Sequence, residues 1–143
     1  MKKEKAIEKL KENFADKIIN WKDRSAKRIY VDVRPDDIPE MARYLFKNLK
    51  ARFITASGVD MPKAIEIIYH FSFDEGVLVL SLRTTVAKPE PEIESIAPII
   101  KGAEWIEREI WELLGVNFKN HPNLKRLLMA EDWPEGVYPL RRE

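Results

Sequence analysis

The chain has no cysteine and no glutamine among its 143 residues. Without cysteine it can form no disulfide and supply no thiolate nucleophile. For the same reason this chain alone cannot hold an iron–sulfur cluster or a thiolate-ligated nickel centre. The lack of these residues, together with 34% charged side chains, is the composition expected of a thermophile protein.

Neither a strong charge imbalance nor a long apolar run is present. Lysine and arginine number 25 and the acidic residues 24, a formal net charge of +1. A dedicated nucleic-acid binder would carry a basic excess, so we expect no nucleic-acid partner. No apolar run approaches the ~20 residues that span a bilayer, and no signal-peptide stretch follows the basic start. The sequence predicts one soluble, intracellular domain without a membrane span.

Catalytic motifs are also missing. There is no GxGxxG or GxxxxGK[ST] phosphate loop, and no serine lies in a nucleophile-elbow pattern. Only two histidines are present. His70 lies within an expected strand, and His121 precedes Pro122, where a hydrogen-bonding loop histidine is favoured over a zinc ligand. We therefore predict no catalytic, cofactor-binding or metal-binding residue in this chain.

The first half of the sequence alternates helical and strand patterns. The first segment, Lys2–Asp23, carries an apolar stripe on a charged background, which predicts an N-terminal helix. The stripe consists of Ile7, Leu10, Phe14 and Ile18. Strands are expected at Arg28–Val33 and from Arg52 to Ser57, ending at Gly58. Between them Asp36 or Asp37 can cap a helix with apolar positions Ile38, Met41, Leu45 and Leu49.

A β-hairpin is the clearest single element. Alternation puts five apolar residues of its first strand on one face, namely Ile65, Ile67, Tyr69, Phe71 and Phe73. The turn residues Asp74, Glu75 and Gly76 include a glycine for a positive φ. The opposite face of this strand is mixed and either solvated or partly covered. We predict an α+β fold, a two-layer sandwich of helices on a small mixed sheet.

The last predicted helix spans Ala103–Leu114 and ends at Gly115. Its apolar stripe consists of Ala103, Ile106, Ile110, Leu113 and Leu114. The opposite side carries Glu104, Glu107, Arg108 and Glu112, and spacing alone favours a solvated, ion-paired surface there. However, Trp105 and Trp111 flank this charged side. Large aromatics in that position indicate a protein interface, although Trp111 could instead fold under the following loop.

The remaining residues cannot form a helix, because Pro134, Gly136 and Pro139 interrupt them. They are nevertheless too apolar for a free disordered tail, since they include Trp133, Val137, Tyr138 and Leu140. The segment must therefore pack on its own domain or on a partner. We divide the chain into an α/β domain, residues 1–116, and a turn with an extended docking arm, residues 117–143.

The run ERE…E-LLGV-F–HP-L-RLLM-EDWPEG–PLR resembles the signature of the 30 kDa subunit family of respiratory complex I (NADH dehydrogenase), found also in membrane-bound [NiFe] hydrogenases. Two departures favour a minimal, hydrogenase-type or archaeal-type relative over an NADH-oxidising complex I subunit. WPEGVYPLR is slightly longer than the spacing common in bacterial complex I members, and the continuation that many relatives carry is absent after Glu143.

The resemblance implies an accessory subunit without its own cofactor, on the cytoplasmic face of the membrane in the peripheral arm of a redox complex. Its partners would be the large (49 kDa-like or hydrogenase large) subunit and neighbouring iron–sulfur subunits. Those partners would carry the nickel–iron centre and the iron–sulfur clusters. An NAD(P)H- or other-donor:quinone oxidoreductase is the alternative assembly.

The expected partner-binding residues come from this resemblance and from the two tryptophans of the helix. Arg108 and Arg126 are expected to make charge-assisted bonds with carboxylates, and Trp133 and Leu140 to act as buried anchors. The full set is Trp105, Glu107, Arg108, Glu109, Trp111, His121, Arg126, Glu131, Asp132, Trp133, Tyr138, Leu140 and Arg141. Pro122 and Pro139 complete the turn and the arm.

Two rival hypotheses remain open. The chain could be an enzyme that uses surface carboxylates and His121, which predicts turnover by the isolated protein. Alternatively it could be a free-standing interaction module whose arm folds onto its own domain, which predicts a monomer with a protected Trp133. The missing cofactor ligands disfavour the first hypothesis, and the tryptophans off the apolar stripe disfavour the second.

Overall fold

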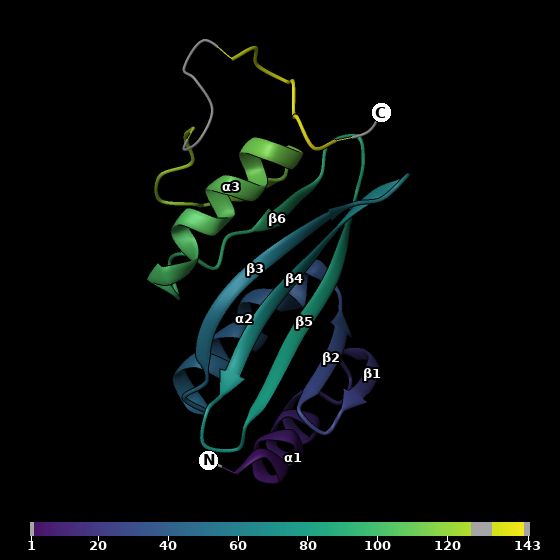
Figure 1. The fold of residues 1–143 in the computed structure, drawn as a ribbon, viewed down its shortest axis with the longest axis vertical. Coiled ribbons are helices and arrows are strands. Elements are labelled where there is room, and N and C mark those ends of the chain that lie inside the picture. Colours follow the sequence, from purple (N-terminus) through teal and green to yellow (C-terminus); the bar gives the residue numbers. More distant parts are fainter. Residues whose placement is uncertain (1, 127–132, 142–143) are drawn as a thin grey trace.

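A computed structural model describes residues 2–126 and 133–141 (Figure 1). In chain order its elements are α1 (Lys3–Phe14), β1 (Ile18–Ser25), β2 (Arg28–Val33), α2 (Ile38–Arg43), β3 (Arg52–Asp60), β4 (Ala64–Phe73), β5 (Leu78–Ala87), β6 (Glu92–Glu94), α3 (Glu104–Leu114) and β7 (Asn117–Lys119). Short 3₁₀ turns at Pro35–Asp37 and Lys101–Ala103 precede α2 and α3, and a π-helical turn, Tyr44–Asn48, follows α2.

The main sheet has five strands in the order β1-β2-β5-β4-β3. Its strands β2 and β5 are parallel, and the other neighbours are antiparallel. A small parallel pair, β6 and β7, forms a second sheet. This mixed sheet with helices confirms the predicted α+β class.

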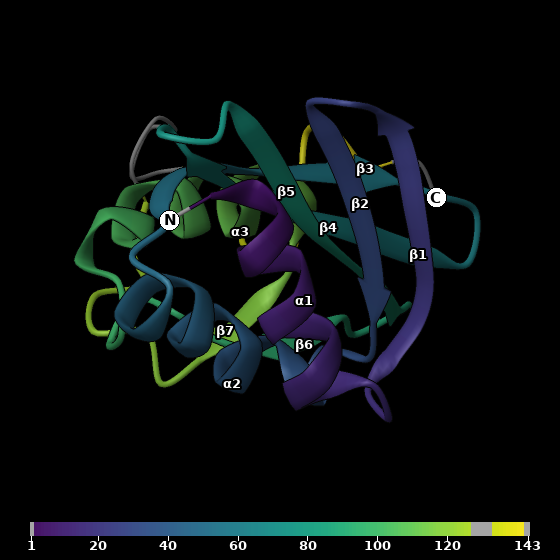
Figure 2. The ribbon, with the colours of Figure 1, turned by 90° about the horizontal axis from the view of Figure 1, so that it is seen from below.

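One face of the main sheet is the core. The five alternating apolar residues of β4 are all buried, as predicted. Figure 2 shows α1, α2 and the β6–β7 pair on one side of the sheet. Helix α3 lies along β3 on this same face, because Ile110 and Leu114 approach the position that a Cβ of Gly58 would occupy. Gly58 pairs with the buried Ile67 across the β3–β4 ladder.

The N-terminal prediction was partly wrong. Helix α1 ends at Phe14, and Ile18 begins a strand, β1, that the sequence pattern did not reveal. Ile18 continues the helical stripe by spacing alone, so periodicity could not separate the two elements. Pairing with β2 satisfies the backbone N–H and C=O groups of this segment and stabilises it as a strand.

Two glycines have other roles than predicted. Strand β3 runs through Gly58 to Asp60, because the missing side chain leaves room for Leu114. In the β4–β5 turn the positive φ belongs to Val77, at 50°, and not to Gly76. A Cβ on Gly76 would lie 2.8 Å from the backbone nitrogen of Lys3, so this glycine admits the start of α1.

The second helix follows its predicted apolar pattern closely. Ile38, Met41, Leu45 and Leu49 are all buried. Asp37 occupies the N-cap position but makes no capping bond; instead its carboxylate accepts a hydrogen bond from Arg34 Nε at 3.1 Å. The chain turns into the π-helical segment after Arg43, and Leu45 still points into the core.

Candidate functional site

Helix α3 places its charged residues inside the molecule, against the expectation of a solvated face. The side opposite the apolar stripe contains Glu107, Arg108 and Glu112, which are 0%, 6% and 5% exposed. Gly115 ends the helix with a φ of 77°, as predicted. The segments before and after α3 cover the charged side, and helical spacing carries no information about them.

Glu107 joins α3 to the loop after β6. Its carboxylate accepts hydrogen bonds from Ser95 Oγ at 2.6 Å and from the Ile96 amide at 3.1 Å. Burial raises the pKa of Glu107 to about 7, although these hydrogen bonds act in the opposite direction. The fully buried Tyr69 hydroxyl has no hydrogen-bond partner among the described residues. Burial, with the nearby Glu107 charge, raises the pKa of Tyr69 well above its usual value.

His121 ties the turn after β7 to the start of α3. Its Nδ1 accepts the Asn123 amide proton at 2.9 Å, so the ring proton lies on Nε2. Nε2 then donates to the carbonyl oxygen of Glu104 at 2.9 Å. The nearest Glu107 oxygen is 4.0 Å from Nε2. His121 is therefore a hydrogen-bonding loop histidine, as its sequence context favoured.

Arg108 holds the end of the same loop. Its guanidinium donates to the carbonyl oxygens of Lys125 and Arg126 at 3.0 and 2.9 Å. The expected carboxylate partner is thus replaced by two backbone carbonyls. The guanidinium also lies 5.8 Å from the ring centre of Trp105, which is 66% exposed. We call Glu107, Arg108 and His121 the brace, since Glu107 fastens the loop after β6 to α3 and the other two fasten the loop of residues 117–126 to it.

The arm, residues 133–141, returns to the other end of α3 (Figure 1). The Leu140 amide donates to the Leu113 carbonyl at 2.9 Å, and Arg141 donates to the Pro89 carbonyl. A Cβ on Gly115 would lie 2.6 Å from the Tyr138 ring, so only glycine fits beneath this tyrosine. The arm therefore packs on its own domain.

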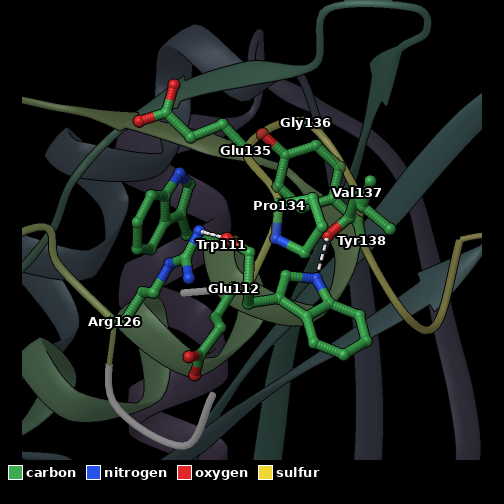
Figure 3. Close-up of a pocket in the computed structure, with 9 residues that line it drawn as sticks. Trp111, Glu112, Arg126, Pro134, Glu135, Gly136, Val137 and Tyr138 are labelled. Carbon is green, nitrogen blue, oxygen red and sulfur yellow. Dashed lines mark hydrogen bonds between the residues drawn. The ribbon is translucent and has the colours of Figure 1, made fainter. Parts of the chain in front are cut away.

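A cavity of about 350 Å³ lies between α3 and the arm (Figure 3). It is lined by Trp111, Glu112, Arg126, Trp133, Pro134, Glu135, Gly136, Val137 and Tyr138. Arg126 reaches across it and donates to the Trp133 carbonyl, and Trp133 Nε1 donates to the Val137 carbonyl at 2.8 Å. The cavity has aromatic walls and charged groups at its margin.

The predicted partner-binding residues thus fall into three groups. Glu107, Arg108 and His121 form the brace, and Trp111, Arg126, Trp133 and Tyr138 line the cavity. The third group is at the surface: Trp105 at one end of α3, the half-buried Glu109, and Leu140 with Arg141 on the arm. Leu140 is 57% exposed in this chain, so any anchoring role requires a partner. Glu131 and Asp132 lie outside the described residues.

Sequence reasoning missed Ser95, which orients the Glu107 carboxylate, and the burial of Glu112. No signal marked either, because both depend on which loop covers α3.

On the sheet face opposite the core, His70 hydrogen-bonds Ser57 and Ser81, at 3.1 and 2.7 Å. Within residues 2–126 and 133–141 no group of three acidic or histidine side chains could hold a metal ion. No helix in the described parts is long and apolar enough to cross a membrane.

Comparisons with known proteins cover most of the chain. A family model described as "Respiratory-chain NADH dehydrogenase, 30 Kd subunit" matches residues 31–143. A subunit of the F(420)H(2) dehydrogenase of Methanosarcina mazei is 36% identical over 140 residues, covering 96% of this chain and 88% of that protein. A subunit of the NADH-quinone oxidoreductase of Citrifermentans bemidjiense is 29% identical over 143 residues, covering 97% and 87%.

Solved structures share the fold. A chain of the membrane-bound sulfane sulfur reductase, described as an archaeal respiratory membrane complex, superposes with a TM-score of 0.83 at 23% identity, covering 96% of this chain and 82% of that one. A trypsin-resistant fragment of Nqo5 superposes with a TM-score of 0.66 at 20% identity, covering 87% and 100%. The match of the family model to most of the sequence, including α3, the brace and the arm, shows that the chain belongs to the 30 kDa subunit family of respiratory-chain NADH dehydrogenase.

Proposed function

We propose that this chain is a non-catalytic docking subunit of a complex I-like respiratory membrane complex. The observation that carries the proposal is the surface of α3 and the arm. Trp105 is 66% exposed although the charged side chains beside it are buried, and Val137 and Leu140 are exposed on the arm. A large exposed aromatic on a rigid support is typical of an interface anchor.

The brace gives this surface its rigidity. Because Glu107, Arg108 and His121 bind inside the chain, they act on docking through the two loops that they hold against α3 and not by direct contact. The arm is also ordered on its own domain before any partner arrives. Such pre-ordering reduces the entropy lost on association. The partner that we propose for this surface is the large subunit of the complex, with the iron–sulfur subunits as further neighbours.

Two types of complex are candidates. The spacing of WPEGVYPLR favours a [NiFe] hydrogenase type, in which the large subunit holds nickel and iron. The 36% identity to a subunit of an F(420)H(2) dehydrogenase favours a dehydrogenase type instead. In both, we propose that this chain binds no cofactor itself, because its partners would supply the redox centres. The family resemblance further leads us to propose a position at the cytoplasmic face of the membrane.

The test is purification of the N-terminally tagged chain from gently solubilised native membranes, with identification of copurifying proteins and metals. A large subunit with nickel and iron would support the hydrogenase type. Iron without nickel, together with dehydrogenase subunits, would support the second type. Recovery of the chain alone would contradict the docking function and favour a free-standing module. Turnover by the isolated chain would contradict the non-catalytic role.

A further inference from the structure

Glu107 is a titratable side chain in the interior of the domain. Its carboxylate is buried and accepts hydrogen bonds from two neutral donors, Ser95 Oγ and the Ile96 amide. Among the described residues no lysine or arginine forms an ion pair with it. The neighbouring Arg108 donates to loop carbonyls instead. A carboxylate in such a place must either keep its proton or gain further donors.

Three segments of the described chain bring polar groups to this carboxyl from outside α3. Strand β4 contributes the fully buried Tyr69 hydroxyl, which has no hydrogen-bond partner among the described residues. The turn after β7 contributes His121, whose side chain is 0% exposed. The loop after β6 contributes Ser95 and backbone amides. The titratable groups that face Glu107 are therefore one tyrosine and one histidine.

His121 is held in a single neutral tautomer. Its Nδ1 accepts the Asn123 amide proton, and its Nε2 donates to the Glu104 carbonyl. A second proton, on Nδ1, would face the N–H of Asn123 and break this hydrogen bond. Tyr69 keeps its proton, because burial and the Glu107 charge raise its pKa well above the usual value. The proton that can leave this cluster is therefore that of Glu107.

The Nε2–H of His121 lies close to two acceptors. It is bonded to the Glu104 carbonyl at 2.9 Å, and the nearest Glu107 oxygen is 4.0 Å from Nε2. A hydrogen bond to that oxygen needs a movement of only about 1 Å. The Glu104 carbonyl tolerates the loss, because this residue begins α3 and its carbonyl also accepts a helical hydrogen bond. A charged acceptor binds an N–H more strongly than a neutral carbonyl does.

We propose that Glu107 and His121 form a proton-operated switch that sets the position of the turn after β7. While the carboxyl is protonated, His121 holds the Glu104 carbonyl. When the carboxyl releases its proton to solvent, the Nε2–H moves to the carboxylate, and Asn123 follows the ring because its amide is bonded to Nδ1. Burial raises the pKa of Glu107 to about 7, so this movement falls near neutral pH.

NMR spectra of the full-length chain, labelled with carbon-13 and nitrogen-15, test the switch between pH 5.5 and 8.5. We expect the Glu107 carboxyl carbon, the His121 Nε2–H and the Asn123 amide to change together, with a common midpoint near pH 7. The imidazole should stay neutral throughout. A carboxyl signal that changes alone, or that does not titrate in this range, would overturn the proposal. Formation of an imidazolium at His121 would overturn it as well.

Glu107→Gln removes the titrating proton and keeps the size of the side chain. Its His121 and Asn123 signals should stay constant over the same pH range. A transition of these signals that persists in the variant would assign the titration to another group and overturn the switch.

Ser95→Ala tests the linkage without removing the carboxyl group. The variant loses a donor to the carboxylate, so the midpoint should rise by at least about one pH unit, equally for the Glu107, His121 and Asn123 signals. A His121 midpoint that stays in place while the carboxyl midpoint rises would overturn the proposal. Ser57→Ala is the matched control and should leave all three midpoints unchanged, because Ser57 lies on the sheet face opposite the core.

Discussion

The two ends of α3 bind the following chain in opposite ways. At the brace, side chains of the helix hold backbone groups of the loop, and the charges are buried. At the arm, one backbone pair and one aromatic ring hold the chain, and apolar side chains remain exposed. The difference teaches that a single sequence signature combines an internal support with an exposed apolar surface. We therefore expect variants of the brace to change mainly the stability of the domain, and variants of exposed side chains on α3 and the arm to change mainly the assembly with a partner.

Arg108→Ala should have the largest effect on stability. The substitution leaves the Lys125 and Arg126 carbonyls without their charged donor and removes a packed side chain, so we expect a loss of about 3 kcal/mol. Urea unfolding of the isolated chain measures it. Arg108→Lys keeps the charge but cannot donate to both carbonyls with the same fork geometry, and it should recover only part of the loss. A loss of stability below about 1 kcal/mol would show that Arg108 does not hold the loop against α3.

The buried Glu107 should make stability depend on pH. Its pKa is about 7 in the folded chain and near 4.5 when unfolded, so the folded state holds the proton more tightly. Stability from this group is therefore complete below pH 4.5 and is lost as pH rises towards 7, by about 3 kcal/mol in total.

Glu107→Gln isolates this contribution. Its amide can donate to Ser95 Oγ and accept from the Ile96 amide, as a protonated carboxyl would. Urea unfolding from pH 4.5 to 8 should therefore give a flatter stability curve for the variant than for the unaltered chain. Parallel curves for both proteins would show that Glu107 is ionised throughout this range.

Two tryptophan variants test the contribution of exposed α3 and of the arm to binding of the partner. Trp105→Ala should weaken binding to the partner by about 2 kcal/mol, roughly 30-fold in affinity, and leave unfolding unchanged. Trp133→Ala should also cost about 2 kcal/mol of assembly energy, but it should additionally loosen the arm, because Trp133 Nε1 bonds Val137. Affinity titration with the purified complex partners provides the measurement. Unchanged affinity in either variant would exclude that tryptophan as an anchor.

Glycine substitutions on the arm side should have the smallest effects. Gly115→Ala and Gly136→Ala both place alanine at a positive φ, near 77° and 78°, and each should cost about 1 kcal/mol for this reason. Only Gly115 lies under the Tyr138 ring, whereas nothing lies within 4 Å of a Cβ on Gly136. The first variant should therefore also speed proteolysis of the arm. Equal proteolysis of both variants would mean that the ring contact does not hold the arm.

The sequence predicted the parts of this fold that depend on local periodicity. The hairpin, the buried face of β4 and the end of α3 at Gly115 followed from spacing and turn chemistry. The brace did not, because the partners of Glu107 and Arg108 come from segments eleven to eighteen residues away. A helical wheel assigns such residues to solvent. The cavity depends on the return path of the arm and was likewise beyond prediction.

The brace is closed by residue 126, before the arm begins, and this order has a consequence for how the family can diversify. The domain fastens its last loop without using any arm side chain. Changes in the exposed side chains of the arm should therefore cost the domain little stability and, on the proposed docking function, should alter what the protein attaches to.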